Sequence, residues 1–231
     1  MHIPDGYLSP ATCGVMYAAA APFWYKAAKK VKEALTSKTV PLLSIFAAFS
    51  FTIMMFNAPV PDGTTAHAVG GTLIALILGP WAATIGVSIA LLIQAIFFGD
   101  GGILAFGANC FNMAVVLPFV GYAVYRAISG DAPLSSSRHW IGAAIGGYMG
   151  INAAALCAAI EFGLQPALFH AADGTPLYCP YGLSQAIPAM MFAHLTIAGL
   201  AEAVVTGGVV TFLQRAMPSL MELRAKKEVA A

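Results

Sequence analysis

The sequence predicts an all-α integral membrane protein with seven transmembrane helices. Its residues are 59% hydrophobic and only 9% charged, and its mean hydropathy is +0.80. A soluble domain carries about a quarter charged residues. Long apolar segments separated by short polar turns recur along the chain, and each crossing of a bilayer needs about 20 apolar residues. We therefore expect a single multi-pass domain over residues 1–231, surrounded by the lipid of a cell membrane.

The first three predicted spans lie in the amino-terminal third of the chain. The first, residues 9–35, is apolar until its last turns, where lysines appear from Lys26 onward. The second covers residues 39–56. The third, residues 68–78, is short unless it begins inside the polar loop 57–67 that precedes it.

Turn residues separate the other four spans. These spans cover residues 81–98, 103–125, 140–159 and 186–213. Gly79-Pro80 precedes the first of them, and a Gly-Asp-Gly-Gly sequence at 99–102 precedes the second. A linker rich in Gly, Pro and Ser at 129–137 and a long loop at 161–185 precede the last two. Gly and Pro clusters of this kind mark turns and loops.

Three glycines recur at every fourth position of the sixth span, at Gly142, Gly146 and Gly150. This spacing is typical of helices that pack closely in membranes. It indicates either internal packing or a docking face for a partner protein.

The basic residues predict the orientation in the membrane. All eleven fall at positions 26–38, 126, 138 and 215–227, which lie on one side under this arrangement. The other side carries acidic residues alone, namely Asp5, Asp62, Asp100, Glu161 and Asp173. Because basic loops remain in the cytoplasm, we expect the amino terminus outside and the carboxyl terminus in the cytoplasm. A net charge of +1 gives no indication of nucleic-acid binding.

The first ten residues, Met1 to Pro10, are polar and stiffened by two prolines. They lack the basic segment of a cleavable signal peptide, so we expect them to be retained as an external segment with a free amine. That amine, the amide nitrogen of His2 and the imidazole of His2 can close two fused chelate rings on one ion. A tetragonal nitrogen site favours Cu(II) or Ni(II). The alternative is that His2 is a solvated residue near a mobile terminus.

His67 can supply a fourth nitrogen. It lies at the mouth of the third span, after the external loop 57–67, which contains Pro59 and Pro61. With the three nitrogens of the terminus, its imidazole would complete a plane suited to Ni(II), with Cu(II) as a competitor. Four polar residues close in sequence could orient these ligands or could simply be turn residues. They are Asp5, Asn57, Thr64 and Thr65.

The sequence leaves the roles of His194, Glu202 and Cys179 open. His194 and Glu202 lie inside the last span, where polar groups are costly, and their spacing places them on one helical face. They could form an interhelical hydrogen bond or line an ion path. Cys179 is the one cysteine in a polar loop; the other three lie in apolar runs and fit small core positions.

These motifs resemble a known family. The run from Met1 to Pro10 resembles the start of NikM and CbiM, the substrate-capture subunits of energy-coupling factor (ECF) nickel and cobalt transporters. The similarity covers roughly the first 125 residues by motif and the remainder by topology. The tripeptide Ile3-Pro4-Asp5 resembles NikM more than CbiM. The other matching motifs are Phe56–Pro59, Gly63–His67, Phe98–Ile103, Gly107–Asn109 and Asn112–Ala114.

The resemblance implies a binding subunit and not an enzyme. In this family the terminal amine, the second-residue histidine and a histidine of the next external loop bind the ion, which here correspond to Met1, His2 and His67. It implies Ni(II), with Co(II) as the alternative, as cargo, and no organic cofactor. The implied partners are a transmembrane coupling subunit, a pair of cytoplasmic ATPases and, in some relatives, a small accessory membrane subunit.

The sequence agrees with ATPases on separate chains, because it has no P-loop. It ends soon after the last span, so we expect no fused accessory subunit. Two other functions stay open. A stand-alone secondary nickel or cobalt permease would carry intramembrane His and Asp ligands at helical spacing, which are missing here. An intramembrane metalloenzyme would use Glu161, His194 and Glu202, yet the sequence lacks paired Glu-x-x-His sets.

Overall fold

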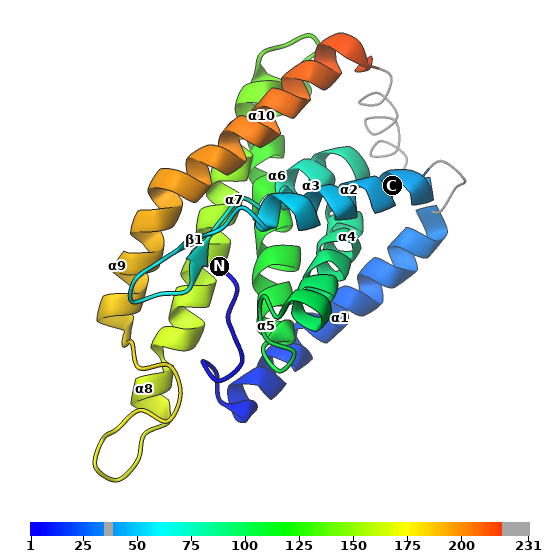
Figure 1. Ribbon diagram of the computed structural model, residues 1–231. Helices are drawn as coiled ribbons and strands as arrows, with labels where there is room; N and C mark the ends of the chain where they lie inside the picture. The colour runs from blue at the N-terminus through cyan, green and yellow to red at the C-terminus, as the bar shows by residue number, and fades with distance from the viewer. Residues whose placement is uncertain (35–38, 219–231) are drawn as a thin grey trace.

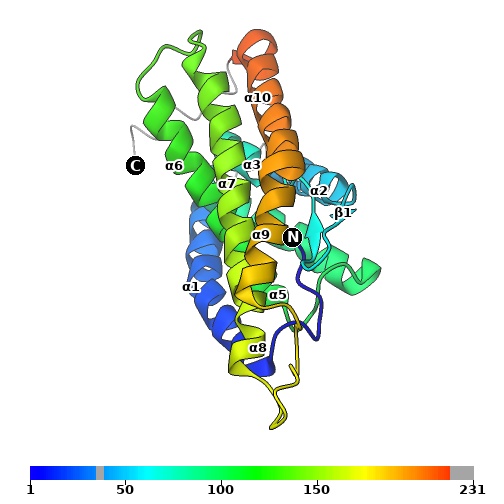
Figure 2. The ribbon, with the colours of Figure 1, turned by 90° about the vertical axis from the view of Figure 1, so that its left-hand side faces the viewer.

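The computed structural model describes residues 1–34 and 39–218, and these are mostly helical. The expected orientation in the membrane rests partly on Lys38 and the basic residues between 219 and 227, which lie outside the described residues. In both ribbon views the amino terminus lies in the middle of the molecule, beside β1 (Figures 1 and 2). The chain therefore begins inside the helical assembly rather than at its edge.

Helices account for the bulk of the fold, in two groups along the chain. The first group comprises α1 (Pro10–Ala34), α2 (Thr39–Met54), α3 (Gly71–Leu78) and α4 (Pro80–Ile93) with the π-helical turn η1 (Gln94–Phe98). The second comprises α5 (Phe106–Cys110), η2 (Phe111–Val116), α6 (Leu117–Ser129), α7 (Arg138–Gly163), α8 (Gln165–Leu168), α9 (Leu183–Ala193), η3 (His194–Ala198) and α10 (Gly199–Ala216).

Four of the described helices are long and apolar enough to cross a membrane. They run over Pro80–Phe98, Phe106–Ser129, Arg138–Leu168 and Leu183–Ala216. These are the last four predicted spans. Helix α1 has 25 residues but ends in lysines, and α2 is a shorter apolar helix of 16 residues.

The third predicted span differs most from its expectation. The predicted helix over 68–78 begins later, at Gly71, and has eight residues, which gives a length of about 12 Å. The residues before it, 66–70, are buried but not helical. The side chain of Glu202 explains this, because its carboxylate accepts hydrogen bonds from Val69 N and Gly70 N at 2.7 and 2.9 Å. Irregular backbone at membrane depth is tolerated where protein groups satisfy it in this way.

Two short strands lead into this segment. β1 (Ala58–Pro59) pairs antiparallel with β2 (Thr65–Ala66), with Ala58 opposite Ala66. The hairpin folds the loop back on itself, so that β2 and the residues after it enter the interior beside α9 and η3.

The glycine repeat of α7 packs internally, as the first interpretation predicted. A Cβ atom on Gly146 would lie 2.5 Å from the carbonyl oxygen of Gly121, and one on Gly150 would lie 2.6 Å from that of Leu117. Helix α6 therefore lies directly against the backbone of α7, and this face is not available to a partner.

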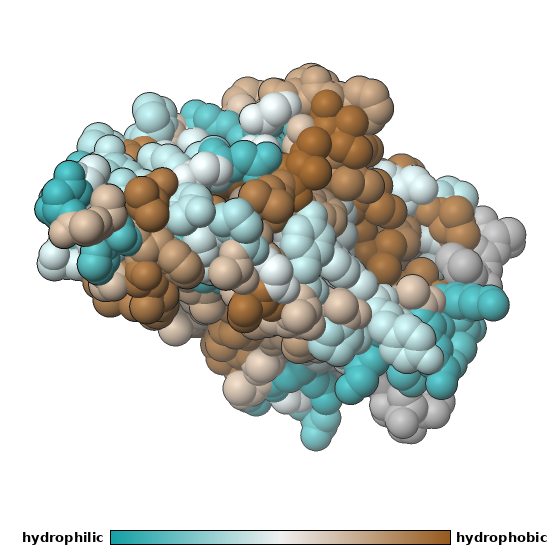
Figure 3. Space-filling view, turned by 90° about the horizontal axis from the view of Figure 1, so that it is seen from below, coloured by the Kyte–Doolittle hydropathy of each residue, from teal (hydrophilic) through white to brown (hydrophobic). Residues whose placement is uncertain are grey.

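Large apolar side chains remain exposed on the outside of the helices. The most exposed of them are Tyr25, Phe56, Phe97, Phe192 and Val204. Figure 3 shows apolar patches across one face of the molecule, with hydrophilic residues gathered toward its ends. A surface of this kind suits contact with lipid, where there is no penalty for exposed hydrocarbon.

Candidate metal centre

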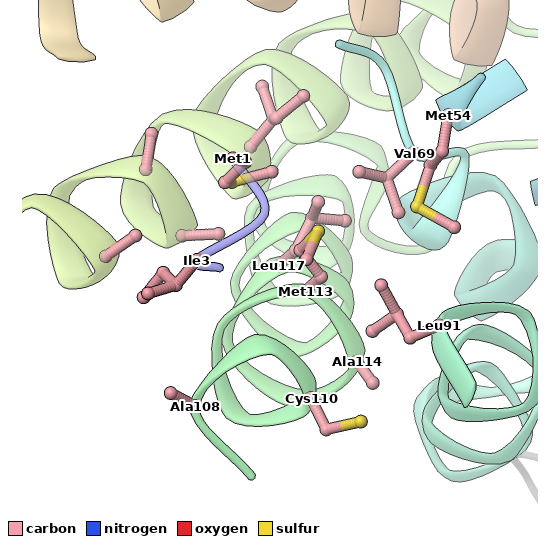
Figure 4. Close-up of a cluster of buried hydrophobic side chains, with 14 of the residues drawn as sticks. Met1, Ile3, Met54, Val69, Leu91, Ala108, Cys110, Met113, Ala114 and Leu117 are labelled. Carbon is pink, nitrogen blue, oxygen red and sulfur yellow. The ribbon is translucent and has the colours of Figure 1, made fainter. Parts of the chain in front are cut away.

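The amino-terminal segment is part of the core. Met1 and Ile3 are fully buried, and they lie beside the helix that carries Met113 and Leu117 (Figure 4). His2 between them is 3% exposed. The alternative in which His2 is a solvated residue near a mobile terminus is therefore wrong, because apolar side chains on both sides of it anchor the terminus inside.

Polar side chains fix the backbone of this segment. Asn109 forms two hydrogen bonds to Ile3: Ile3 N donates to Asn109 Oδ1 at 2.8 Å, and Asn109 Nδ2 donates to Ile3 O at 3.0 Å. Further along, Asp5 accepts hydrogen bonds from Ile103 N and Ala105 N, each at 3.1 Å. The Asn109 side chain thus makes the pair of hydrogen bonds to Ile3 that a neighbouring strand would make. The Asp5 carboxylate links the segment to the turn at residues 100–105.

Thr65 holds the first two nitrogens. The amine of Met1 donates a hydrogen bond to the carbonyl oxygen of Thr65 and another to Thr65 Oγ1, the latter at 2.6 Å. The amide N–H of His2 also points to Thr65 Oγ1, at 3.3 Å. One side chain of strand β2 therefore places the amine and the next amide next to each other.

Each imidazole has one nitrogen engaged and one with a free lone pair. His67 Nδ1 donates to the carbonyl oxygen of Ala68 at 3.1 Å, and His2 Nε2 donates to Gln94 Oε1 at 3.1 Å. His67 Nε2 and His2 Nδ1 are buried and have no hydrogen-bond partner among the described residues. Metal-binding histidines commonly donate their second N–H to a carbonyl in this way, which fixes the tautomer.

The two rings lie close together, with centroids 4.6 Å apart and planes tilted by 32°. An acidic group lies at the edge of the pair, because Asp100 Oδ1 is 3.6 Å from His2 Nδ1. Asp100 is partly buried, and this burial raises the pKa of its carboxyl group. The site thus combines four nitrogen donors with one carboxylate close by.

Burial keeps the donors uncharged. It lowers the pKa of His2 from 6.5 to about 3, and the neighbouring amine lowers it further in the same direction. Burial also lowers the pKa of the Met1 amine and of His67, and for His67 the amine and His2 add to the effect. Because ligands must be deprotonated to bind a metal, these groups are prepared for a cation at neutral pH.

The predicted outer residues have different positions. Thr65 contacts the amine directly, and Asp5 fixes the segment that carries it. Thr64 Oγ1 lies 3.7 Å from the sulfur of Met190, and Asn57 is exposed. Cys179 is buried and its backbone N–H donates to Tyr7 O, so its sulfur is not exposed in the loop.

Sequence reasoning missed two residues that contact the site. Gln94 is an isolated polar residue in the apolar span 81–98, and Asn109 lies in a similar apolar run. Their isolation at membrane depth was the available signal, since such residues usually face a protein interior. Gln94 also begins the π-helical turn η1, and turns of this kind frequently occur at functional sites.

Backbone nitrogens are essential to any metal centre here. Among residues 1–34 and 39–218, no three His, Cys, Asp or Glu side chains converge closely enough to hold an ion. The amine of Met1 and the amide of His2 would have to complete the set. A multi-pass helical protein with uncharged nitrogen donors around its own buried terminus belongs to the class of membrane proteins that handle transition-metal ions.

The chain belongs to the CbiM family. Residues 2–220 match the family described as "cobalt uptake substrate-specific transmembrane region". The chain is 59% identical over 224 residues to the fused nickel transport protein NikMN of Rhodobacter capsulatus, covering 97% of this chain and 65% of that one. It is 57% identical over 223 residues to LarMN of Lactiplantibacillus plantarum, also named for nickel transport, covering 95% and 66%.

The fold is that of a solved transporter. A crystal structure of a transition metal transporter matches with a TM-score of 0.89 and 62% identity, covering 93% of each chain. The chain spans about two thirds of the length of the fused relatives. These comparisons confirm a multi-pass membrane protein of a nickel and cobalt transport family. The proteins it is similar to are named as transport proteins and not as enzymes, which argues against the metalloenzyme alternative.

Proposed function

We propose that this protein captures Ni(II) outside the cell and passes it inward as the substrate-specific subunit of an ECF-type transporter. The observation that carries the proposal is the convergence of the Met1 amine, the His2 amide, His2 Nδ1 and His67 Nε2 in one buried place. A square-planar set of four nitrogens is a geometry that Ni(II) accepts readily. The names of the similar fused relatives favour nickel over Co(II).

The energy for import would come from other chains. The proposal includes a transmembrane coupling subunit, a pair of cytoplasmic ATPases and a small accessory membrane subunit as partners. It also retains seven crossings, with the amino terminus outside. Here the third crossing would consist of α3 together with the buried non-helical residues 68–70 before it.

Calorimetry on the chain with an unmodified Met1 tests the proposal. We expect one Ni(II) per chain, with the absorption spectrum of a four-nitrogen planar complex. His2→Gln should abolish that spectrum, because it removes the ring that closes the second chelate. Glutamine is bulky, so the initiator methionine should stay. Retention of the planar spectrum in His2→Gln, or absence of Ni(II) binding by the unchanged protein, would refute the capture mechanism.

A further inference from the structure

His194 has no role in the site described above, yet its environment is unusual. It is the first residue of the π-helical turn η3 within the long helix from α9 to α10, and its side chain is fully buried. π-Helical turns widen the helix and are frequent at functional sites. A buried histidine at such a position invites comparison with the two histidines at the amino terminus.

The ring of His194 is in the same state as that of His67. His194 Nδ1 lies 2.8 Å from the carbonyl oxygen of Met190. A carbonyl only accepts, so Nδ1 carries the hydrogen and Nε2 keeps a lone pair. His194 Nε2 is buried and has no partner among the described residues, exactly like His67 Nε2. His139 differs, because Tyr125 and Ala132 engage both of its ring nitrogens.

His67 and His194 belong to two segments that lie side by side. The segment of residues 63–70 runs beside the helix from Met190 to Glu202. At one end Thr64 Oγ1 lies 3.7 Å from Met190 Sδ, and at the other Val69 N donates to Glu202. His67 lies between these two contacts, as His194 does on the helix. Among the causes that lower the pKa of His67, the charge of His194 is the smallest.

Polar atoms continue beyond His194 into the bundle. Asn152 Oδ1 and Thr206 Oγ1 are buried without a partner among the described residues. Asn152 lies against Gly199, one turn beyond His194, and Thr206 lies against Gly147. Buried polar groups are normally hydrogen-bonded, so the interior beyond His194 keeps two acceptors available, one on α7 and one on α10.

Building on the proposed function, we propose that His194 is a second-stage metal ligand. Its Nε2 binds the ion together with His67 Nε2 after His2 has released it. In this exchange the lone pair of His194 replaces a nitrogen of His2, and the deprotonated amide of His2 takes back from water the proton that it lost when the ion bound. His194 follows the first site rather than joining it, because the described imidazoles do not form a compact three-ligand cluster.

Copper spectroscopy on the full chain in detergent tests this role. Cu(II) serves as the probe, since pulsed electron paramagnetic resonance counts the imidazoles bound to it. In the His2→Gln chain we expect two, from His67 and His194. This measurement leaves residue 194 unchanged, so a folding defect of a substituted His194 cannot affect it. One imidazole, or no bound copper, overturns the proposal.

Double variants identify the second ring. His2→Gln with His194→Gln should bind copper through one imidazole and at least about tenfold more weakly, since even loss of an outer partner costs that much. His2→Gln with His139→Gln is the matched control and should keep two. Two imidazoles after substitution of His194 would also overturn the proposal. Failure of the unchanged chain to bind Ni(II) would instead count against the proposed function.

Discussion

The imidazoles of His2 and His67 approach to 4.6 Å between ring centroids, although one belongs to the first residues of the chain and the other to the loop before α3. Each ring has its other nitrogen occupied, by Gln94 and by Ala68 respectively. The remaining lone pairs belong to His2 Nδ1 and His67 Nε2.

Substitution of His67 by Gln should weaken Ni(II) binding by more than about 100-fold, because loss of a direct ligand exceeds the effect of losing an outer partner. Competition with a chelator of known affinity measures the change. His170→Gln is the control, because His170 is exposed. Equal losses in both variants would mean that His67 is not a ligand.

Thr65→Val should lower Ni(II) affinity by roughly tenfold, a typical effect of losing an outer-shell contact. Valine keeps the shape of threonine but removes the oxygen that accepts from the Met1 amine and the His2 amide. Thr65→Ser retains the hydroxyl and should bind nearly as well as the unchanged protein. Calorimetry on the unchanged protein and the two variants separates loss of the hydroxyl from loss of the methyl group. A valine variant that binds Ni(II) as tightly as the unchanged protein would contradict the role assigned to Oγ1.

Gly102→Ala should displace the amino-terminal segment. An added Cβ would lie 2.6 Å from the backbone nitrogen of Asp5, so the segment would have to move and carry the donors with it. We expect lower Ni(II) affinity and a lower midpoint of thermal unfolding. Gly208→Ala, where nothing lies within 4 Å of the added atom, is the matched control. It should leave Ni(II) affinity unchanged and should not lower the midpoint, because alanine is a better helix former than glycine.

Acid should destabilise the metal-free protein as the pH falls from 6.5 toward 3. An unfolded histidine titrates near 6.5, whereas the pKa of His2 in the folded protein is about 3 and that of His67 is also lowered. In this window the unfolded state binds protons that the folded state does not, so stability decreases with decreasing pH. Above 6.5 the two histidines should have no effect.

Thermal unfolding in detergent at a series of pH values measures this dependence. His2→Gln should make the dependence shallower, because glutamine does not titrate and only His67 of the two histidines remains. His170→Gln should leave it unchanged. A dependence as steep in His2→Gln as in the unchanged protein would show that other groups cause the acid sensitivity.

Regular periodicity and turn residues made the long helices predictable. The segments 81–98, 103–125, 140–159 and 186–213 correspond to continuous helices, and the glycines of α7 pack as expected. The third span was mispredicted because hydropathy reports burial and not backbone shape. Residues 66–70 are buried but not helical, and a distant carboxylate, Glu202, satisfies the N–H groups of Val69 and Gly70. Such a long-range contact leaves no local signal.

The candidate site was predictable where chemistry alone selects the residues. A terminal amine, the adjacent histidine and a second histidine in a loop form a recognisable donor set. The residues that position them were less visible, since the roles of Gln94 and Asn109 depend on the packing of α4 and α5 around the terminus. Whether Met1, His2 and His67 bind the ion stays a prediction, as do the orientation in the membrane and the partner subunits.

The crossing of α6 and α7 limits where this protein can change shape. At Gly121 and Gly146 the two backbones meet without a side chain between them, so neither helix can slide without steric collision. This pair would act as a fixed frame during delivery of cargo. Rearrangement would then be left to segments outside this pair, and the first few residues of the chain are one such segment, held by hydrogen bonds of single side chains.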